Sequence, residues 1–181
     1  MQPVRAALLS SRIFWAITLV FCALEAAILA TALDYSTEED RLATQLAVTH
    51  LASGVAWRLT STTVAAEAEP QLAWLESILE GLNRGGPVNT LDNTLIQLEP
   101  VRSPEARQTL TDAIARLGSA TRLHGAMPGS DLVREEIRGL VPSFAQLGAH
   151  LAAQRNESGR LAALLVGLAL VSTTGGFIAA G

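Results

Sequence analysis

The last third of the chain, from Ser130 to Gly181, changes its hydrophobic pattern at Arg160. Before Arg160, apolar residues recur in alternating steps of four and three, which places them on one face of a helix. These residues are Val133, Ile137, Leu140, Phe144, Leu147 and Leu151. After Arg160 the chain has no charged residue and is apolar on every side, as a helix surrounded by lipid requires. The sequence therefore predicts a helix that begins in a water-soluble bundle and crosses a membrane over residues 161–181.

A second apolar segment, residues 13–33, follows a short N-terminus that carries Arg5 and Arg12. As a helix it spans about 30 Å, enough to cross a bilayer. The residues that follow it are acidic: Asp34, Glu38, Glu39 and Asp40. Basic residues before the span and acidic residues after it predict that residues 1–12 lie in the cytoplasm and residues 34–160 outside it.

A cleaved signal peptide is the alternative interpretation of this segment, because Ala30-Thr31-Ala32 has the small-x-small form of a cleavage site. We favour an anchor, because the apolar segment is longer than the ~7–15-residue core of a signal peptide. Glu25 lies inside the segment, where a carboxyl is costly and often marks a proton path or a helix contact. Without a second titratable residue to relay a proton, the sequence favours a protonated Glu25 that bonds to a neighbouring helix. The expected partners are Ser172, Thr173 or Thr174.

Helical spacing continues through the region between the two apolar segments. Residues 38–66 carry a stripe, which Pro70 is expected to end: Val48, Leu51, Val55, Arg58, Thr62 and Ala65. Residues 71–84 carry a second stripe, with Trp74 beside it: Leu72, Leu75, Leu79 and Leu82. After an interruption at Gly85-Gly86-Pro87, helical spacing resumes at Leu91, Leu95 and Leu98. No strand alternation is evident from the sequence.

Two further helices are marked by their N-terminal residues. Ser103 followed by Pro104 is a helix start, because Ser caps the first turn and Pro suits it. The helix that follows carries its stripe on Leu110, Ile114, Leu117, Thr121 and His124. Met127-Pro128-Gly129 is expected to turn the chain before Ser130 caps the last helix, in which Pro142 should introduce a kink or a break.

The predicted fold is all-α: two transmembrane helices flank an up-down-up-down antiparallel four-helix bundle. Both spans have to reach the same membrane face, so the chain between them passes along the bundle an even number of times. The expected divisions are a cytoplasmic N-terminus (1–12), a first transmembrane helix (13–33), an extracytoplasmic bundle (34–160) and a second transmembrane helix (161–181).

This arrangement resembles the sensor modules of bacterial chemoreceptors and sensor histidine kinases. The resemblance covers the whole chain as architecture and involves no family motif. It implies a homodimeric receptor in the bacterial inner membrane, with residues 34–160 in the periplasm, that passes a signal to the cytoplasm through its last helix. Such receptors continue into a cytoplasmic signalling domain, whereas this sequence stops at Gly181. We therefore expect either the membrane-proximal part of a longer receptor or a small membrane protein. The alternative function is a non-catalytic accessory subunit of a larger membrane complex.

Several function classes are disfavoured by composition and spacing. The formal net charge of -4 argues against a nucleic-acid partner. His50, His124 and His150 have no His or Cys neighbour at metal-ligand spacing, so neither a metal nor a cofactor is expected. Phosphate loops, nucleophile elbows and dinucleotide fingerprints are absent from the sequence, so an enzyme is not expected. The single Cys22 permits no disulfide within the chain.

A candidate ligand site is predicted from the distance of each Arg and Trp residue along its helix, measured from the nearest membrane span. Arg58 occupies an otherwise apolar stripe, so it needs either an acidic partner or an anion. Counting ~1.5 Å per residue from each span places other Arg and Trp side chains in the same layer. The candidate set is Arg58, Trp57, Trp74, Arg122, Arg134 and Arg138. Guanidinium groups beside aromatic faces would suit a small carboxylate or an inorganic anion. The alternative is that these Arg residues pair with nearby Glu side chains in water.

Overall fold

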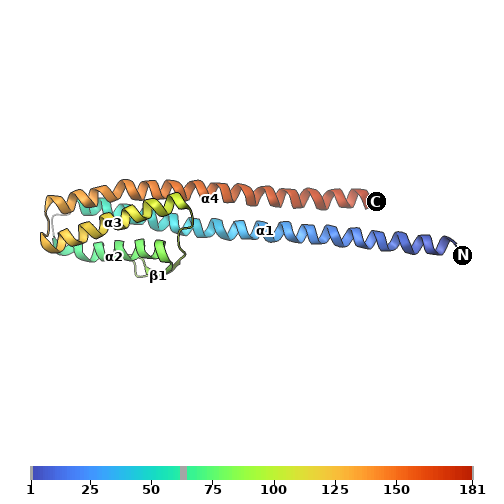
Figure 1. The fold of residues 1–181 in the computed structure, drawn as a ribbon, viewed down its shortest axis with the longest axis horizontal. Coiled ribbons are helices and arrows are strands. Elements are labelled where there is room, and N and C mark those ends of the chain that lie inside the picture. The colour runs from blue at the N-terminus through green and yellow to red at the C-terminus, as the bar shows by residue number, and fades with distance from the viewer. Residues whose placement is uncertain (1, 62–64, 181) are drawn as a thin grey trace. The chain divides into compact units, whose positions relative to one another are not determined.

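The computed structural model describes the backbone of residues 2–61 and 65–180 and the side chains of Trp15, residues 18–61 and residues 68–170. The helices are α1 (Gln2–Ser61), α2 (Ala65–Arg84), α3 (Pro104–Ala126) and α4 (Asp131–Ala180), and strands β1 (Gly86–Asn89) and β2 (Leu95–Leu98) form a small sheet (Figure 1). The predicted all-α class is confirmed apart from this sheet. The chain divides into two compact units, residues 40–156 and residues 1–39 with 157–181.

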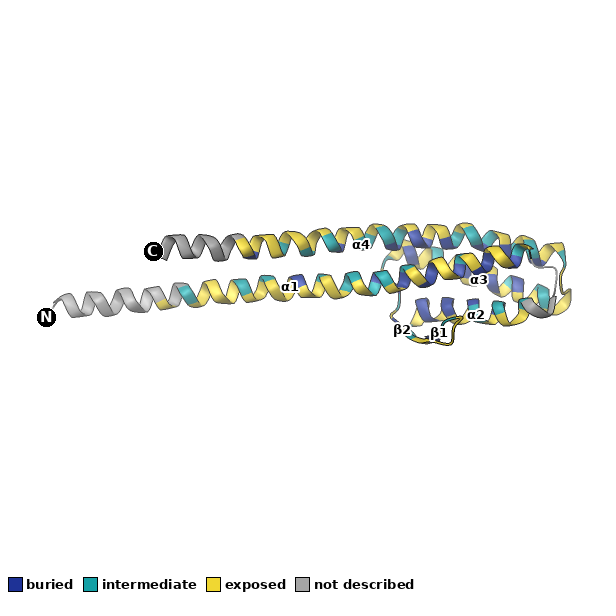
Figure 2. Cartoon of the chain, turned by 180° about the vertical axis from the view of Figure 1, so that it is seen from behind, coloured by how far each residue is buried: buried dark blue, intermediate teal, exposed yellow. Residues whose placement is uncertain are grey.

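The unit of residues 40–156 has one hydrophobic core, to which α1, α2, α3, α4 and the sheet all contribute. Figure 2 shows the buried residues on the faces that these helices turn toward one another. All four predicted leucines of α2 are buried: Leu72, Leu75, Leu79 and Leu82. All six predicted residues of α4 are buried as well: Val133, Ile137, Leu140, Phe144, Leu147 and Leu151. These two stripes are therefore confirmed residue by residue.

The buried face of α1 differs from the predicted one. Val48 and Val55 are buried as expected, but Leu51 is 48% exposed and Arg58 is exposed. The core contacts come instead from Ala52, Ala56 and Leu59. The buried face is therefore rotated toward a stripe that contains small residues. Thr62 lies outside the described residues, and the side chain of Ala65 is not described.

The boundaries between the first two helices also differ from those expected. α1 ends at Ser61 and α2 begins at Ala65, so Pro70 lies within the first two turns of α2 and does not end α1. On α3, Leu110 and Leu117 are buried as predicted, together with Ala106, Ala113 and Ala120. Ile114 and Thr121 are exposed, and His124 is half-buried.

The helical continuation expected over residues 91–98 is wrong, because residues 86–98 form an antiparallel hairpin. Gly86 pairs with Leu98 and Asn89 pairs with Leu95. Gly85 and Gly86 have φ angles of 79° and 127°, which a right-handed helix cannot contain. The alternation of burial along the strands places Val88 and Leu98 on the core side and leaves Leu95 in solvent.

The hairpin packs against α2 at Gly81. A Cβ atom at Gly81 would lie 2.5 Å from Val88 Cγ2 and 3.0 Å from Leu98 Cδ1. The Leu82 carbonyl also accepts a hydrogen bond of 2.8 Å from the Val101 amide, after the hairpin returns. The absence of a side chain at Gly81 is thus what lets the sheet lie on the helix.

Helix caps and turns follow the sequence signals. Ser103 Oγ accepts a hydrogen bond from the Ala106 amide, and Ser130 Oγ accepts one from the Val133 amide. Residues 127–129 turn the chain between α3 and α4, and Gly129 has a φ of 75°. Pro142 is exposed within α4, and the helix continues through it without a break.

A buried polar cluster ties α1 to the segment that follows the hairpin. Gln45 is 1% exposed, and its Nε2 donates to the Glu99 carbonyl at 2.8 Å. Arg41 Nη1 donates to the Pro100 carbonyl at 3.1 Å. Thr49, also buried, donates back to the Gln45 carbonyl. These bonds hold the start of α3 against α1 in a fixed register.

In the unit of residues 1–39 and 157–181, most of the large apolar side chains that the structure describes are exposed. On α1 these are Trp15, Leu19, Val20, Phe21, Leu24, Leu29 and Leu33, and on α4 they are Leu161, Leu164, Val166, Leu168 and Leu170. Small residues make the covered stripe, among them Ala32 on α1 and Ala169 on α4. Within the described residues, one helix, near the N-terminus, is long and apolar enough to cross a membrane. The side chains of residues 171–180 fall outside the description.

Candidate functional site

The predicted Arg and Trp layer starts from Arg58, which the structure places on the exposed face of α1 next to the exposed Trp57. The premise that Arg58 occupies a buried stripe is therefore wrong. A guanidinium in water pays no desolvation penalty and needs neither a buried acid nor an anion. The physical argument that singled out Arg58 does not apply to the folded chain.

The other three Arg residues of the predicted layer make contacts with groups three or four residues away along the same helix. Arg134 pairs with Asp131 at 2.9 Å, and Arg138 pairs with Glu135 at 2.6 Å. Arg122 Nε donates to the Gly118 carbonyl at 3.1 Å. Such exposed contacts three or four residues apart contribute little to stability. They agree with the alternative that these side chains pair locally in solvent.

Trp74 has a structural contact that the sequence did not indicate. Its ring is half-buried against the core, and Nε1 donates to the Asn89 carbonyl at 2.8 Å. The indole therefore anchors the hairpin on α2. Glu25 is half-buried in the other unit. The side chains of its expected partners, residues 172–174, lie outside the described part, so that prediction stays open.

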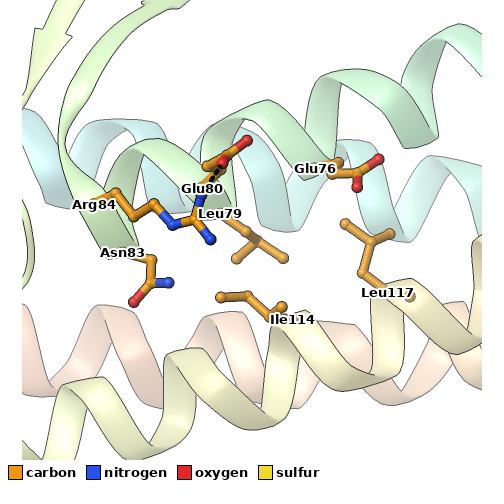
Figure 3. A pocket seen from close by; sticks show the side chains of 8 residues that line it. Glu76, Leu79, Glu80, Asn83, Arg84, Ile114 and Leu117 are labelled. Carbon is orange, nitrogen blue, oxygen red and sulfur yellow. Dashed lines mark hydrogen bonds and ion pairs between the residues drawn. The ribbon is translucent and has the colours of Figure 1, made fainter.

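A hollow that the sequence did not predict lies between α2 and α3 in the unit of residues 40–156 (Figure 3). Its volume is about 240 Å³, below the ~300–1,000 Å³ typical of pockets for drug-sized ligands. Its lining residues are Glu76, Leu79, Glu80, Asn83, Arg84, Ile114, Leu117 and Gly118. The α2 residues follow helical spacing, so they share one face of that helix.

The floor of the α2–α3 hollow is apolar and its rim is polar. Leu79 and Leu117 are buried at its base, and Ile114 lies beside them. At one end Arg84 Nη1 donates to Glu80 Oε1 at 2.9 Å, next to Asn83, while Glu76 lies toward the other end (Figure 3). One end of the hollow therefore holds the Arg84–Glu80 ion pair beside Asn83, and the other end holds the Glu76 carboxylate.

The rim side chains have hydrogen-bonding capacity left over. A guanidinium has five N–H donors, and Arg84 uses one of them in its ion pair with Glu80. The hydrogen bonds and ion pairs within the described residues engage neither the Glu76 carboxylate nor the Asn83 amide. Gly118 also lines the hollow, and a Cβ atom there would meet no atom within 4 Å.

A second hollow, of about 500 Å³, lies between α3 and α4 around Pro142. Arg116 closes one side of it, because a Cβ at Gly139 would lie 2.7 Å from Arg116 Nη1. The same guanidinium lies 3.9 Å from Glu136. The Arg116 guanidinium therefore occupies the side of this hollow next to Gly139.

Across the described residues, no group of three His, Cys, Asp or Glu side chains is placed to hold a metal ion. His50 and His150 lie on α1 and α4, and His124 is in the last turn of α3. No protein family model, curated protein or solved structure matches this chain.

The α2–α3 hollow could have been suspected only in part from the sequence. Glu76, Glu80 and Arg84 recur every four residues beside the buried Leu79, which places them on one solvated face of a helix. The sequence does not show that Ile114 turns away from the core and that Gly118 faces this row. Both facts depend on the rotation of α3, which its buried alanines set.

Proposed function

We propose that the chain is the membrane-anchored sensor region of a bacterial receptor. In this proposal residues 13–33 and 161–181 cross the inner membrane and residues 34–160 form an antiparallel four-helix bundle in the periplasm. Binding at the bundle would shift α4 relative to α1 and so pass a signal to the cytoplasm, because a helix transmits displacement along its axis. The homodimer that the resemblance implies stays a prediction.

The observation that carries this proposal is the exposure of large apolar side chains in the unit of residues 1–39 and 157–181. Leu19, Leu33 and Leu164 are each more than 60% exposed, and none of them belongs to the hydrophobic core found among the described residues. Soluble monomers rarely expose contiguous apolar surface on this scale. Lipid would cover these side chains at no cost to the helical backbone, whose hydrogen bonds are internal.

Cysteine labelling tests the proposed topology. The experiment uses the full chain with Cys22→Ala, because Cys22 is the single native thiol and is exposed. Into this background either Ser77→Cys, on the exposed surface of α2, or Arg5→Cys is introduced. An impermeant maleimide added to intact spheroplasts should label the Ser77→Cys chain, and should label the Arg5→Cys chain only after the membrane is opened.

Equal labelling of the two chains in intact spheroplasts contradicts the topology. A signal peptide is distinguished in the same samples by the mass of the chain. Cleavage after Ala32 removes the Arg5→Cys site altogether, whereas an anchor keeps it.

A further inference from the structure

We propose that the hollow between α2 and α3 binds a small zwitterion whose ammonium and carboxylate groups are separated by a short aliphatic chain. This inference rests on the proposed sensor function and gives its ligand a chemical class. It concerns a different place from the Arg58 layer, since none of those six Arg and Trp residues lines the hollow.

The two ends of the hollow offer different groups to a ligand: the remaining N–H donors of Arg84, which is paired with Glu80, at one end, and the Glu76 carboxylate at the other. Glu76 offers a carboxylate that the described contacts leave available for an ammonium group. Arg84 keeps further N–H donors beside the Asn83 amide, and a carboxylate can accept from both. A ligand with only one charge would satisfy one end and leave the other end in water.

The middle of the hollow indicates that the part of the ligand between its charged groups is apolar. Leu79, Ile114 and Leu117 give an apolar floor between the charged ends (Figure 3). Methylene groups laid on this floor would leave water at ~25 cal/mol per Å² of buried apolar surface. A zwitterion with adjacent charges would not use that floor.

The length of the ligand follows from helix geometry. Glu76 and Glu80 are one helical turn apart, or about 6 Å along the axis. Arg84 turns back toward Glu80, so its guanidinium lies close to that level. A chain of four methylene groups separates a terminal ammonium from a carboxyl carbon by about 6 Å when extended, from bonds of ~1.5 Å. We therefore choose 5-aminopentanoate, whose charged groups have about this separation, as the probe.

The test compares 5-aminopentanoate with pentylamine and pentanoate, which each lack one charged group. The full chain is placed in lipid nanodiscs, and its thermal midpoint is followed by tryptophan fluorescence at increasing probe concentration. We expect 5-aminopentanoate to raise the midpoint. The amine and the acid should bind about tenfold more weakly or worse, since each loses one charge-assisted hydrogen bond.

Matched variants locate the site. Gly118→Leu adds a large side chain at a position that lines the hollow and should abolish the response to 5-aminopentanoate. Gly125→Leu is the control, because Gly125 is also an exposed α3 glycine with nothing within 4 Å of its Cβ position, and it does not line the hollow. Glu76→Gln removes a charge at nearly constant side-chain size, and Arg84→Gln removes a charge and shortens the side chain; each should weaken binding about tenfold or more.

Three outcomes overturn the proposal: no response to 5-aminopentanoate up to its solubility limit, an equal response to pentylamine or pentanoate, or an unchanged response in the Gly118→Leu chain. Since Glu76→Gln and Arg84→Gln change only exposed side chains, they keep the test decisive if Gly118→Leu does not fold. Binding is measured on the purified chain and topology by labelling in spheroplasts, so failure of one proposal is distinguishable from failure of the other.

Discussion

Glycine has opposite structural roles at two positions of this chain. Gly81 on α2 is in contact with the hairpin, where a Cβ atom would come within 2.5 Å of Val88 Cγ2. Val is branched at Cβ and cannot turn away freely. Gly118 on α3 has open space at its Cβ position. Gly81 is needed for packing of the hairpin on α2, whereas Gly118 makes no such contact and lowers the helix propensity of α3.

These contacts predict opposite stability changes for the same substitution. Gly118→Ala should stabilise by up to about 1 kcal/mol through helix propensity. Gly81→Ala gains the same propensity but forces Val88 and the hairpin to shift, at a cost of about 1–3 kcal/mol. The thermal midpoint of the full chain should therefore rise for Gly118→Ala and fall for Gly81→Ala. A rise of similar size in both would show that the hairpin does not pack on Gly81.

Ser103 bonds to a carboxylate as well as to the backbone. Its hydroxyl donates to Glu105 Oε2 at 2.7 Å and accepts from the Ala106 amide at 3.4 Å. The hydroxyl's hydrogen bond holds the pKa of Glu105 below its usual 4.5. A carboxyl whose folded pKa is depressed stabilises the fold above its unfolded pKa and loses that contribution as the pH falls through the folded pKa.

We predict that Ser103→Ala raises the pKa of Glu105 toward 4.5, so that Glu105 is protonated at a higher pH than in the parent chain. The same change removes a helix cap, which costs about 0.5–2 kcal/mol. Carboxyl chemical shifts of Glu105 during an acid titration measure the pKa directly. Ser130→Ala is the control, since it removes the α4 cap and should leave the pKa of Glu105 where it was.

At the scale of elements, the hairpin is the part of the fold that sequence spacing misidentified. Leu91, Leu95 and Leu98 fall at helical intervals, yet only Leu98 is buried, while Leu91 and Leu95 are exposed. The decisive signal was local: Gly85 and Gly86 have positive φ angles, and Pro87 lacks an amide proton. Those three residues end α2. The segment that follows is too short for hydrophobic spacing to distinguish the period of a helix from that of a strand.

The rotation of α1 has a different cause. Its sequence offers two overlapping stripes, one containing Leu51 and Arg58 and the other containing Ala52, Ala56 and Leu59. A prediction that gives most weight to large apolar residues selects the stripe with Leu51 and Arg58. The structure buries the second stripe and leaves Leu51 and Arg58 exposed. Because Arg58 is not buried, the physical reason for placing an anion beside it does not hold.

α2 and α4 could be predicted residue by residue because their stripes are made of large apolar residues without a competing stripe. On α3, alanines again decide the rotation: Ala106, Ala113 and Ala120 are buried, and Ile114 is turned toward the α2–α3 hollow. The site therefore depends on the part of the packing that binary hydrophobic patterning does not determine.

At the scale of the whole molecule, α1 and α4 each contribute to both units, and their apolar residues meet different surroundings in each. Leu147 on α4 is fully buried in the core of residues 40–156. Leu164 on the same helix is 69% exposed in the other unit. Equal hydrophobicity in the sequence thus corresponds to two roles, one in packing and the other, in our proposal, in contact with lipid.

The last prediction separates these roles by substitution along α4. Leu147→Ala opens a cavity where Leu147 is 0% exposed, and it should cost about 2–5 kcal/mol. For a unit of this size that corresponds to a fall of roughly 10 °C in the thermal midpoint. Leu132→Ala is the matched control, because Leu132 lies in the same helix at 57% exposure and makes no part of the core. Its free energy of unfolding should change by less than about 0.5 kcal/mol, as at other exposed surface sites. The thermal midpoint of this variant should therefore stay close to that of the parent chain. The midpoint of the full chain in nanodiscs, followed by tryptophan fluorescence, measures both. Similar midpoints for the two variants would mean that α4 presents a different face to the core.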